Sequence, residues 1–217
     1  MCSSDLARKI PADIKDLAGR DEMLQLRQTD IRQGPTDVYA VAFAAGAGYG
    51  DPIERDPEAV RDDVEVGDIS PACARDVFRV ALVGEEPAVD HAATRALRHE
   101  ALVERLGHEP RAAVHPRPPV LIRLTEYLDL VEAGNAKRLA CARCGAVLCD
   151  AHENYKAHVL RIDRPIQAAN PLIGDPQRFI DAAVQFRQFY CPACGGLIEN
   201  EVSRSHDPLL RDIELAE

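Results

Sequence analysis

Two pairs of cysteines carry the clearest chemical signal in the sequence. Cys141 and Cys144 lie in "CARCG", and Cys191 and Cys194 lie in "CPACG". In each pair two residues separate the thiols, a spacing that lets the backbone fold back and aim both sulfurs at one ion. Four thiolates bind Zn²⁺ in a closed tetrahedral site. The pattern therefore predicts one structural Zn²⁺ held by Cys141, Cys144, Cys191 and Cys194.

The residues after each pair support this interpretation. Gly145 and Gly195 stand where the turn of a cysteine knuckle favours a positive φ angle. Residues 145–190 separate the two pairs, a longer interval than the simplest zinc ribbons use. We expect a zinc ribbon in which a hairpin and a helix are inserted between the knuckles.

Other chemistry near the first pair stays open at this point. Cys149, His152 and His158 follow it and are candidates for a second metal site, although a packed thiol is the simpler expectation for Cys149. A redox disulfide is another reading of a Cys-x-x-Cys motif, but such a motif normally uses one pair beside a βαβ pattern. Two matched pairs, each followed by glycine, favour the metal.

The sequence offers no catalytic motif. The "GAGYG" stretch at 46–50 lacks both the dinucleotide-binding glycine spacing and the Lys-Ser/Thr of a nucleotide loop, so we read it as a tight turn. The acidic run "RDDVEVGD" at 61–68 is typical of a solvated helix face. Asp62 and Asp63 with His91 or His99 are not fixed as an acid/base dyad by any spacing.

The elements that position these residues fall into an α+β pattern. The turn signal Gly34-Pro35 precedes a strand at 37–44 that is apolar on both faces. Helices begin at Asp56-Pro57 and Ser70-Pro71, because a capping side chain precedes a proline at the first helical position. We expect a strand at 77–84.

The clearest helix of the chain follows at 91–106. Asp90 is its expected cap, and Gly107 is its expected end. The stretch 108–119 holds four prolines without periodicity and is predicted to be a linker.

The second half reads mainly as β-structure. Gly134-Asn135 predicts the turn of a hairpin, residues 158–166 a strand, and Asp175-Pro176 the start of a helix. Residues 184–202 read as strand, knuckle and strand. The acidic tail is expected on a surface or against a partner.

Charge and hydropathy exclude several classes. The formal net charge is −10, with no basic run of five or more and no tryptophan, so the chain lacks what phosphate tracking and base stacking need. No signal peptide and no stretch of 18 apolar residues is present, so no membrane association is expected. Reduced thiols fit a cytoplasmic protein. A nucleic-acid-binding or protein-interaction zinc ribbon remains the alternative function.

Two parts of the chain resemble known families. "AGAGYGDP", "ERDPEAV", "SPACARDVFRVAL" and "ATRALR", within residues 25–105, resemble the C-terminal end of the hydantoinase B family. "EYLDLVEAG", "CARCGAVLCDAHENYKAHVL", "FYCPACGGLIENEV" and "DPLLRDIEL", within residues 120–215, resemble the small gamma subunit of acetone carboxylase. A chain that joins both is similar to the zinc-binding subunit of the acetophenone carboxylase family.

The resemblance implies domain limits within the chain and separate roles for this chain and its partner subunits. It implies a hydantoinase-B-like segment at 1–107, a proline-rich linker at 108–119 and a zinc-ribbon domain of the gamma type at 120–217. It also implies a subunit of an ATP-dependent ligase that carboxylates acetophenone to benzoylacetate with bicarbonate. ATP and Mg²⁺ would bind only to large hydantoinase A-like and hydantoinase B-like partners. This chain would be a non-catalytic member of that hetero-oligomer, with one structural Zn²⁺.

Overall fold

The computed structural model describes residues 19–20, 22, 24, 29–38, 48–169, 173, 175–178 and 180–215. Residues 1–48 and 49–217 form two separate units. In the first unit, the predicted turn at Gly34-Pro35 is present, since the carbonyl of Gly34 accepts the N–H of Asp37 at 3.2 Å. Of the strand predicted at 37–44, residues 39–44 lie outside the described residues.

Three helices form where the sequence predicts them. They are α2 (Pro57–Glu65), α3 (Pro71–Asp76) and α4 (His91–Leu106), preceded by the short η2 (Pro52–Glu54). The expected side chains cap them: Asp56 accepts an N–H of α2, Ser70 one of α3, and Asp90 two of α4. Gly107 ends α4 in the left-handed conformation, with φ +72°. These helix limits are confirmed.

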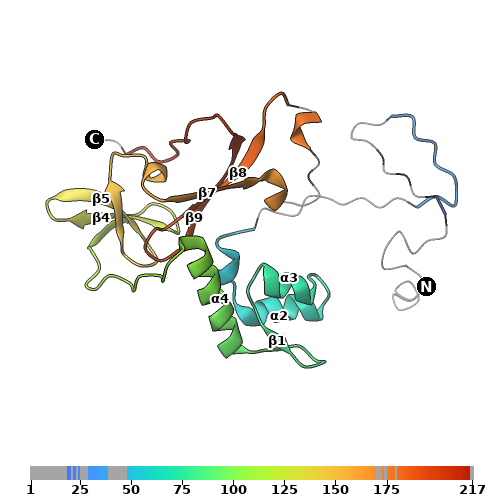
Figure 1. The fold of residues 1–217 in the computed structure, drawn as a ribbon, viewed down its shortest axis with the longest axis horizontal. Coiled ribbons are helices and arrows are strands. Elements are labelled where there is room, and N and C mark those ends of the chain that lie inside the picture. The colour runs from blue at the N-terminus through green and yellow to red at the C-terminus, as the bar shows by residue number, and fades with distance from the viewer. Residues whose placement is uncertain are drawn as a thin grey trace. The chain divides into compact units, whose positions relative to one another are not determined.

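A small apolar core holds α2 and α3 together. Val60, Ala74 and Val80 are almost fully buried and pack against partly buried neighbours. The side-chain hydroxyl of Thr94 in α4 accepts the N–H of Ala81, which links this core to α4. Figure 1 shows α4 beside α2, α3 and β1.

The strand predicted at 77–84 is wrong for most of its length. The N–H groups of Val77 and Phe78 both donate to the carbonyl of Cys73, so these residues close the end of α3. Arg79 then has φ +53°, outside the extended region. Only β1 (Leu82–Val83) remains, paired with β2 (Ala88–Val89).

Two antiparallel sheets form the second half of the chain. The first has the order β3-β4-β5-β6, and the second has the order β7-β8-β9. Their strands are β3 (Val120–Arg123), β4 (Leu128–Ala133), β5 (Ala136–Cys141), β6 (Val147–Asp150), β7 (Leu160–Pro165), β8 (Val184–Tyr190) and β9 (Leu197–Arg204). The predicted hairpin at Gly134 and the predicted strand–knuckle–strand unit are both present. The described residues thus combine helices with antiparallel sheets, as the α+β prediction requires.

The helix predicted after Asp175 is not formed as an α-helix. Asp175 does accept an N–H of the next turn, but that turn is the three-residue η5 (Pro176–Arg178). Since β8 already begins at Val184, little chain remains for more turns. The other short helices between the knuckles, η3 (Tyr155–Ala157) and η4 (Ile166–Ala168), are also of the 3-10 type.

Residues 108–119 have no helix or strand, but they are not a free spacer. The N–H of Arg111 donates to the carbonyl of Ala193, and the N–H of Val114 donates to the carbonyl of Cys144, both at 2.8 Å. The predicted boundary therefore lies inside one compact unit, residues 49–217. The functional division between 1–107 and 120–217 stays a prediction.

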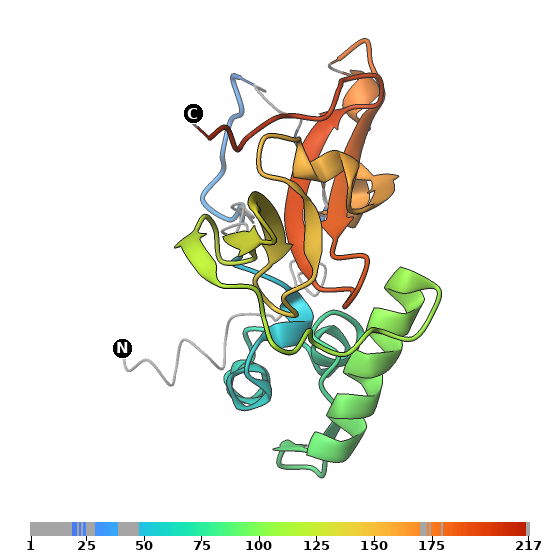
Figure 2. The same cartoon turned by 90° about the vertical axis from the view of Figure 1, so that its left-hand side faces the viewer.

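The tail returns to the core of its own chain. Ile213 and Leu215 pack against the buried cluster around the cysteines. Asp212 accepts the hydroxyl hydrogen of Tyr155 at 3.1 Å and pairs with Lys156. The tail thus lies at the surface, as one of the two expectations has it, and turns the apolar side chains of Ile213 and Leu215 toward the cysteine cluster. Figure 2 shows the tail running along this part of the chain toward the C-terminus.

Candidate metal centre

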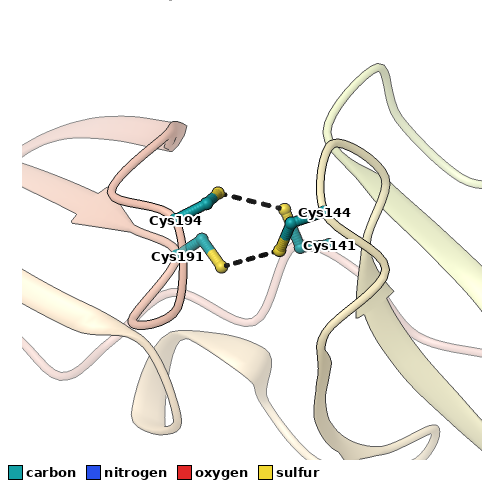
Figure 3. Close-up of side chains that lie close together, drawn as sticks. All are labelled: Cys141, Cys144, Cys191 and Cys194. Carbon is teal, nitrogen blue, oxygen red and sulfur yellow. Dashed lines mark hydrogen bonds between the residues drawn. The ribbon is translucent and has the colours of Figure 1, made fainter. Parts of the chain in front are cut away.

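Four buried thiols meet where two hairpins turn. Cys141 ends β5 and Cys144 lies in the turn to β6, while Cys191 and Cys194 lie in the turn from β8 to β9 (Figure 3). The sulfurs all lie within 4.8 Å of one another. Across the two turns, the sulfurs of Cys141 and Cys194 are 3.9 Å apart and those of Cys144 and Cys191 are 3.8 Å apart.

These separations fit one tetrahedral ion. With Zn–S bonds of about 2.3 Å, the sulfurs of a tetrahedral Zn²⁺ site lie about 3.8 Å from one another. The four residues are all at most 8% exposed. The donor set and its spacing can therefore hold a metal such as zinc, with every coordination position taken by protein.

The two turns are built alike. In the first, the N–H of Gly145 donates to the carbonyl of Cys141 at 2.8 Å, and the N–H of Cys141 donates to the carbonyl of Ala146 at 2.9 Å. The second turn repeats both bonds at 2.9 Å. Gly145 and Gly195 have φ angles of +75° and +73°, as the sequence predicts.

The thiols share their protons unequally. Hydrogen bonding with Cys141 lowers the pKa of Cys144 to about 7 and also lowers the pKa of Cys194. The pKa of Cys141 is raised, first by its hydrogen bond with Cys144. Partial ionisation of a crowded cluster favours a cation that can replace the remaining protons.

Cys149, His152 and His158 do not join the four. Cys149 is buried, and its burial raises the pKa of the thiol to about 11. His152 is exposed, and the ring of His158 lies 3.6 Å from the carboxylate of Glu153. In the described part of the chain, the metal-type cluster consists of the four knuckle cysteines alone.

The other candidates for chemistry are separated. His91 lies 3.3 Å from Glu58, and His99 lies 3.0 Å from Glu109, so neither pairs with Asp62 or Asp63. All four of these histidine and glutamate side chains are more than a third exposed. Such surface pairs do not provide the desolvated acid/base geometry that catalysis needs.

A cavity of about 240 Å³ lies between α4 and strands β7 and β8. Arg79, Arg105 and Arg164 line it, which would suit an anion. Each already has a partner inside the chain, namely Glu104, Asp51 and Gln188 respectively. Glu104 and Asp51 therefore neutralise two of these arginines, whereas the neutral amide of Gln188 leaves the charge of Arg164 uncompensated. The carboxylates of Asp76 and Glu104 also line the cavity.

The linker and a neighbouring arginine cover the first knuckle. Arg117 donates to the carbonyl of Ala142 at 3.1 Å, and a Cβ on Gly145 would lie 3.1 Å from the Arg117 side chain. Arg143 crosses to the second knuckle at Gly196 and pairs with Glu54. Since the N–H of Arg111 donates to the carbonyl of Ala193 in the second knuckle, residues before position 120 contact both knuckles.

Sequence reasoning missed two residues at the second knuckle, Asp51 and Arg105. The Asp51 side chain is fully buried, and Arg105 is 14% exposed. Burial alone would raise the pKa of Asp51, but the hydrogen bonds and charge of Arg105 outweigh it and lower that pKa. The signal Asp51-Pro52 could have predicted a helix cap, which Asp51 is for η2, but not its distant partner.

Known proteins resemble parts of this chain. Residues 114–216 match the family model described as acetone carboxylase gamma subunit. The acetophenone carboxylase beta subunit of Aromatoleum aromaticum is 38% identical over 97 residues, which cover 43% of this chain and 74% of that protein. The acetone carboxylase alpha subunit of Xanthobacter autotrophicus is 34% identical over 74 residues, 33% of this chain but 10% of that protein.

No helix among the described residues combines the length and the apolar character that a membrane crossing requires.

Proposed function

This chain belongs to the family of the acetone carboxylase gamma subunit, and on that premise we propose that it is a non-catalytic, zinc-bearing subunit of an ATP-dependent ketone carboxylase complex. The buried set of four cysteines carries the proposal. A zinc ion with four thiolate ligands has no open position for bicarbonate or an enolate. Its binding energy would instead stabilise the fold.

The chemistry would lie in the partners. His91 and His99 pair with carboxylates at the surface. Glu104 and Asp51 neutralise two of the three arginines that line the cavity. ATP and Mg²⁺ would bind to large hydantoinase A-like and B-like subunits. This chain would contribute architecture to a hetero-oligomer, and its own reaction class would be that of the complex, a ligase forming a carbon–carbon bond.

Acetophenone is the proposed ketone, with benzoylacetate as the product of its carboxylation by bicarbonate. Support comes from the relative of which the chain covers 74%, which is named for acetophenone. The relative named for acetone matches over a tenth of its length. We further propose that residues 1–107 replace a piece of a hydantoinase-B-like partner. The 74-residue likeness to an alpha subunit agrees with a shared segment between subunits of such complexes.

A nucleic-acid-binding zinc ribbon is the weaker alternative. The net charge of −10 would repel phosphates, since affinity for nucleic acid comes largely from lysine and arginine. The knuckles themselves are covered by the chain's own residues 51–119, as the contacts at Gly145 and Gly195 show.

Native purification of the chain from its source tests the proposal. We expect large subunits to travel with it through gel filtration, identified by mass spectrometry, with one zinc per copy of this chain by elemental analysis. ATP-dependent fixation of labelled bicarbonate into acetophenone should require the assembled complex. A free, zinc-free monomer would contradict the proposal.

A further inference from the structure

An ion pair from a distant part of the chain holds the second cysteine knuckle. Asp51 precedes η2, and Arg105 lies in the last turn of α4. The guanidinium donates to both carboxylate oxygens, at 2.6 Å and 2.9 Å. With so little exposure to water, this pair is held in a fixed geometry that a surface pair does not have.

Both members of the pair also form hydrogen bonds with the backbone of the second knuckle. The carboxylate accepts the N–H of Leu197 at 3.1 Å, and the guanidinium donates to the carbonyl of Gly195 at 3.2 Å. Gly196 lies between these two groups, two positions after Cys194. The ion pair therefore fixes the backbone on either side of Gly196, directly after the turn that carries Cys194.

The same helix contacts both ends of this knuckle. The guanidinium of Arg105 lies 4.8 Å from the ring centre of Tyr190, which directly precedes Cys191. At the other end, a Cβ on Gly195 would lie 3.3 Å from the carbonyl oxygen of Leu102 and from a methyl of Leu106. The last turn of α4 thus packs directly on the loop that presents two of the four thiols.

We propose that Asp51 and Arg105 are positioning residues of the metal centre. They fix the second knuckle in the geometry that binds the ion, and they link retention of the metal to docking of α4. The inference rests on the proposed zinc site. Partners of this kind change metal affinity by about 10- to 100-fold. Because coupling is reciprocal, the metal must strengthen the docking of α4 by the same factor.

Chelator competition on the full zinc-loaded chain measures how far the Asp51–Arg105 pair raises the affinity for zinc. We expect Asp51→Asn to lower zinc affinity by about 10- to 100-fold. The matched control is Arg79→Gln, which breaks the pair between Arg79 and Glu104 of α4, 3.0 Å apart and more exposed. The control should keep the wild-type affinity. Equal affinities for Asp51→Asn and the control would overturn the inference.

A second variant distinguishes a specific loss of zinc affinity from a general folding defect. Asp51→Asn alone leaves the buried guanidinium of Arg105 without its counter-charge, which can destabilise the whole chain. The double change Asp51→Asn with Arg105→Met removes both charges. We expect this variant to fold, judged by circular dichroism, and still to bind zinc about 10- to 100-fold more weakly. A folded double variant with wild-type zinc affinity would refute the positioning role.

Amide hydrogen exchange measures the reverse effect, that of the metal on the docking of α4. The N–H groups of Arg111 and Val114 both donate to carbonyls of the knuckles, so they report whether the segment that directly follows α4 stays docked. After zinc removal these two amides should exchange faster, while the N–H of Val60, bonded within α2 to Asp56, should keep its rate. Unchanged protection of Arg111 and Val114 would contradict the coupling.

The outcomes separate the inference from the function on which it rests. A wild-type chain that binds no zinc would refute the proposed function and the inference together. A wild-type chain that binds zinc, beside an Asp51→Asn chain that binds it equally well, would refute the inference alone.

Discussion

The sulfur of Cys144 lies 3.8 Å from the sulfur of Cys191, although 47 positions of the chain separate the two residues. Each residue belongs to a different hairpin, so an ion bound here joins the sheet β3–β6 to the sheet β7–β9. The buried cluster around the four cysteines includes residues of both sheets, such as Leu139 and Ile198. The packing of the two sheets and the binding of metal are therefore expected to form together.

Replacing one ligand tests this directly. Cys191→Ser should lose the zinc and the tertiary structure of the sheets, because the binding free energy of structural zinc, about 10–16 kcal/mol, rivals the stability of a whole domain. Elemental analysis and near-ultraviolet circular dichroism check this. Cys149→Ser, at a buried cysteine outside the four, is the control and should keep one zinc. A Cys191→Ser chain that held full zinc and entered a complex normally would contradict the structural role.

Two glycines of similar conformation separate backbone strain from helix packing. Gly134→Ala should cost about 1–2 kcal/mol of unfolding free energy, because its φ is +67° and nothing lies within 4 Å of the new Cβ. Gly195→Ala has similar strain, at φ +73°, and also places a Cβ 3.3 Å from the backbone oxygen of Leu102. Urea unfolding should show the larger loss for Gly195→Ala. Equal losses of unfolding free energy for the two variants would mean that α4 shifts away from the new Cβ at no measurable cost.

The features that sequence predicted well depend on neighbouring residues. The cysteine knuckles need only the Cys-x-x-Cys-Gly spacing, and their glycines have the expected positive φ. The starts of α2 and α3 need only a capping side chain before a proline, and Asp56 and Ser70 do cap them. Such signals lie within four or five residues, so they are visible without the fold.

The features that sequence missed depend on distant residues or on competing local bonds. Asp51 and Arg105 are 54 positions apart, and no pattern links them. The proline-rich stretch 108–119 looks like a spacer, yet Val114 bonds to the first knuckle. The apolar run after Asp76 reads as a strand, but the backbone bonds that end α3 use its first residues instead. Only tertiary structure decides such cases.

The thiol of Cys149 should be almost unreactive in the folded chain. Its pKa is raised to about 11 by burial, so little thiolate is present at pH 8. Alkylation of Cys149 at pH 8, followed by peptide mass spectrometry, should be slower by a factor of about 200 than that of a free cysteine with an ordinary pKa of about 8.5. In denaturant the difference should disappear. Rapid labelling of native Cys149 would show that the sheet around it opens readily.

The ammonium of Lys156 joins the tail to the second sheet. It lies 3.1 Å from Glu201 and 3.0 Å from Asp212, and only 2% of its side chain is exposed. Lys156→Met removes the charged hydrogen bonds to Glu201, which keeps its pair with Arg187, and to the partly exposed Asp212, and should cost about 1.5–3 kcal/mol. Arg161→Met breaks a more exposed pair with Asp163 and should cost less than about 1 kcal/mol. If urea unfolding showed similar losses of stability for both variants, the buried ammonium of Lys156 would not stabilise the chain more than a surface pair does.

Tyr155 predicts how stability changes at alkaline pH. Burial raises its pKa above the ordinary value of about 10, and the nearby charge of Asp212 adds to the shift. The folded chain therefore keeps a proton that the unfolded chain loses. The resulting stabilisation is complete below pH 10 and is lost as the pH rises above it.

Tyr155→Phe isolates this contribution. At pH 7 the variant should be less stable by about 0.5–1.5 kcal/mol, because it lacks the hydrogen bond to Asp212, 3.1 Å long in the wild type. Above pH 10 the wild type alone must protonate this phenol on folding, so its advantage should shrink and then reverse. Urea unfolding of both chains at pH 7, 9 and 11 measures the difference, in which the other titrating groups cancel. Parallel stability curves across this range would show that the hydroxyl of Tyr155 is solvated in the native protein.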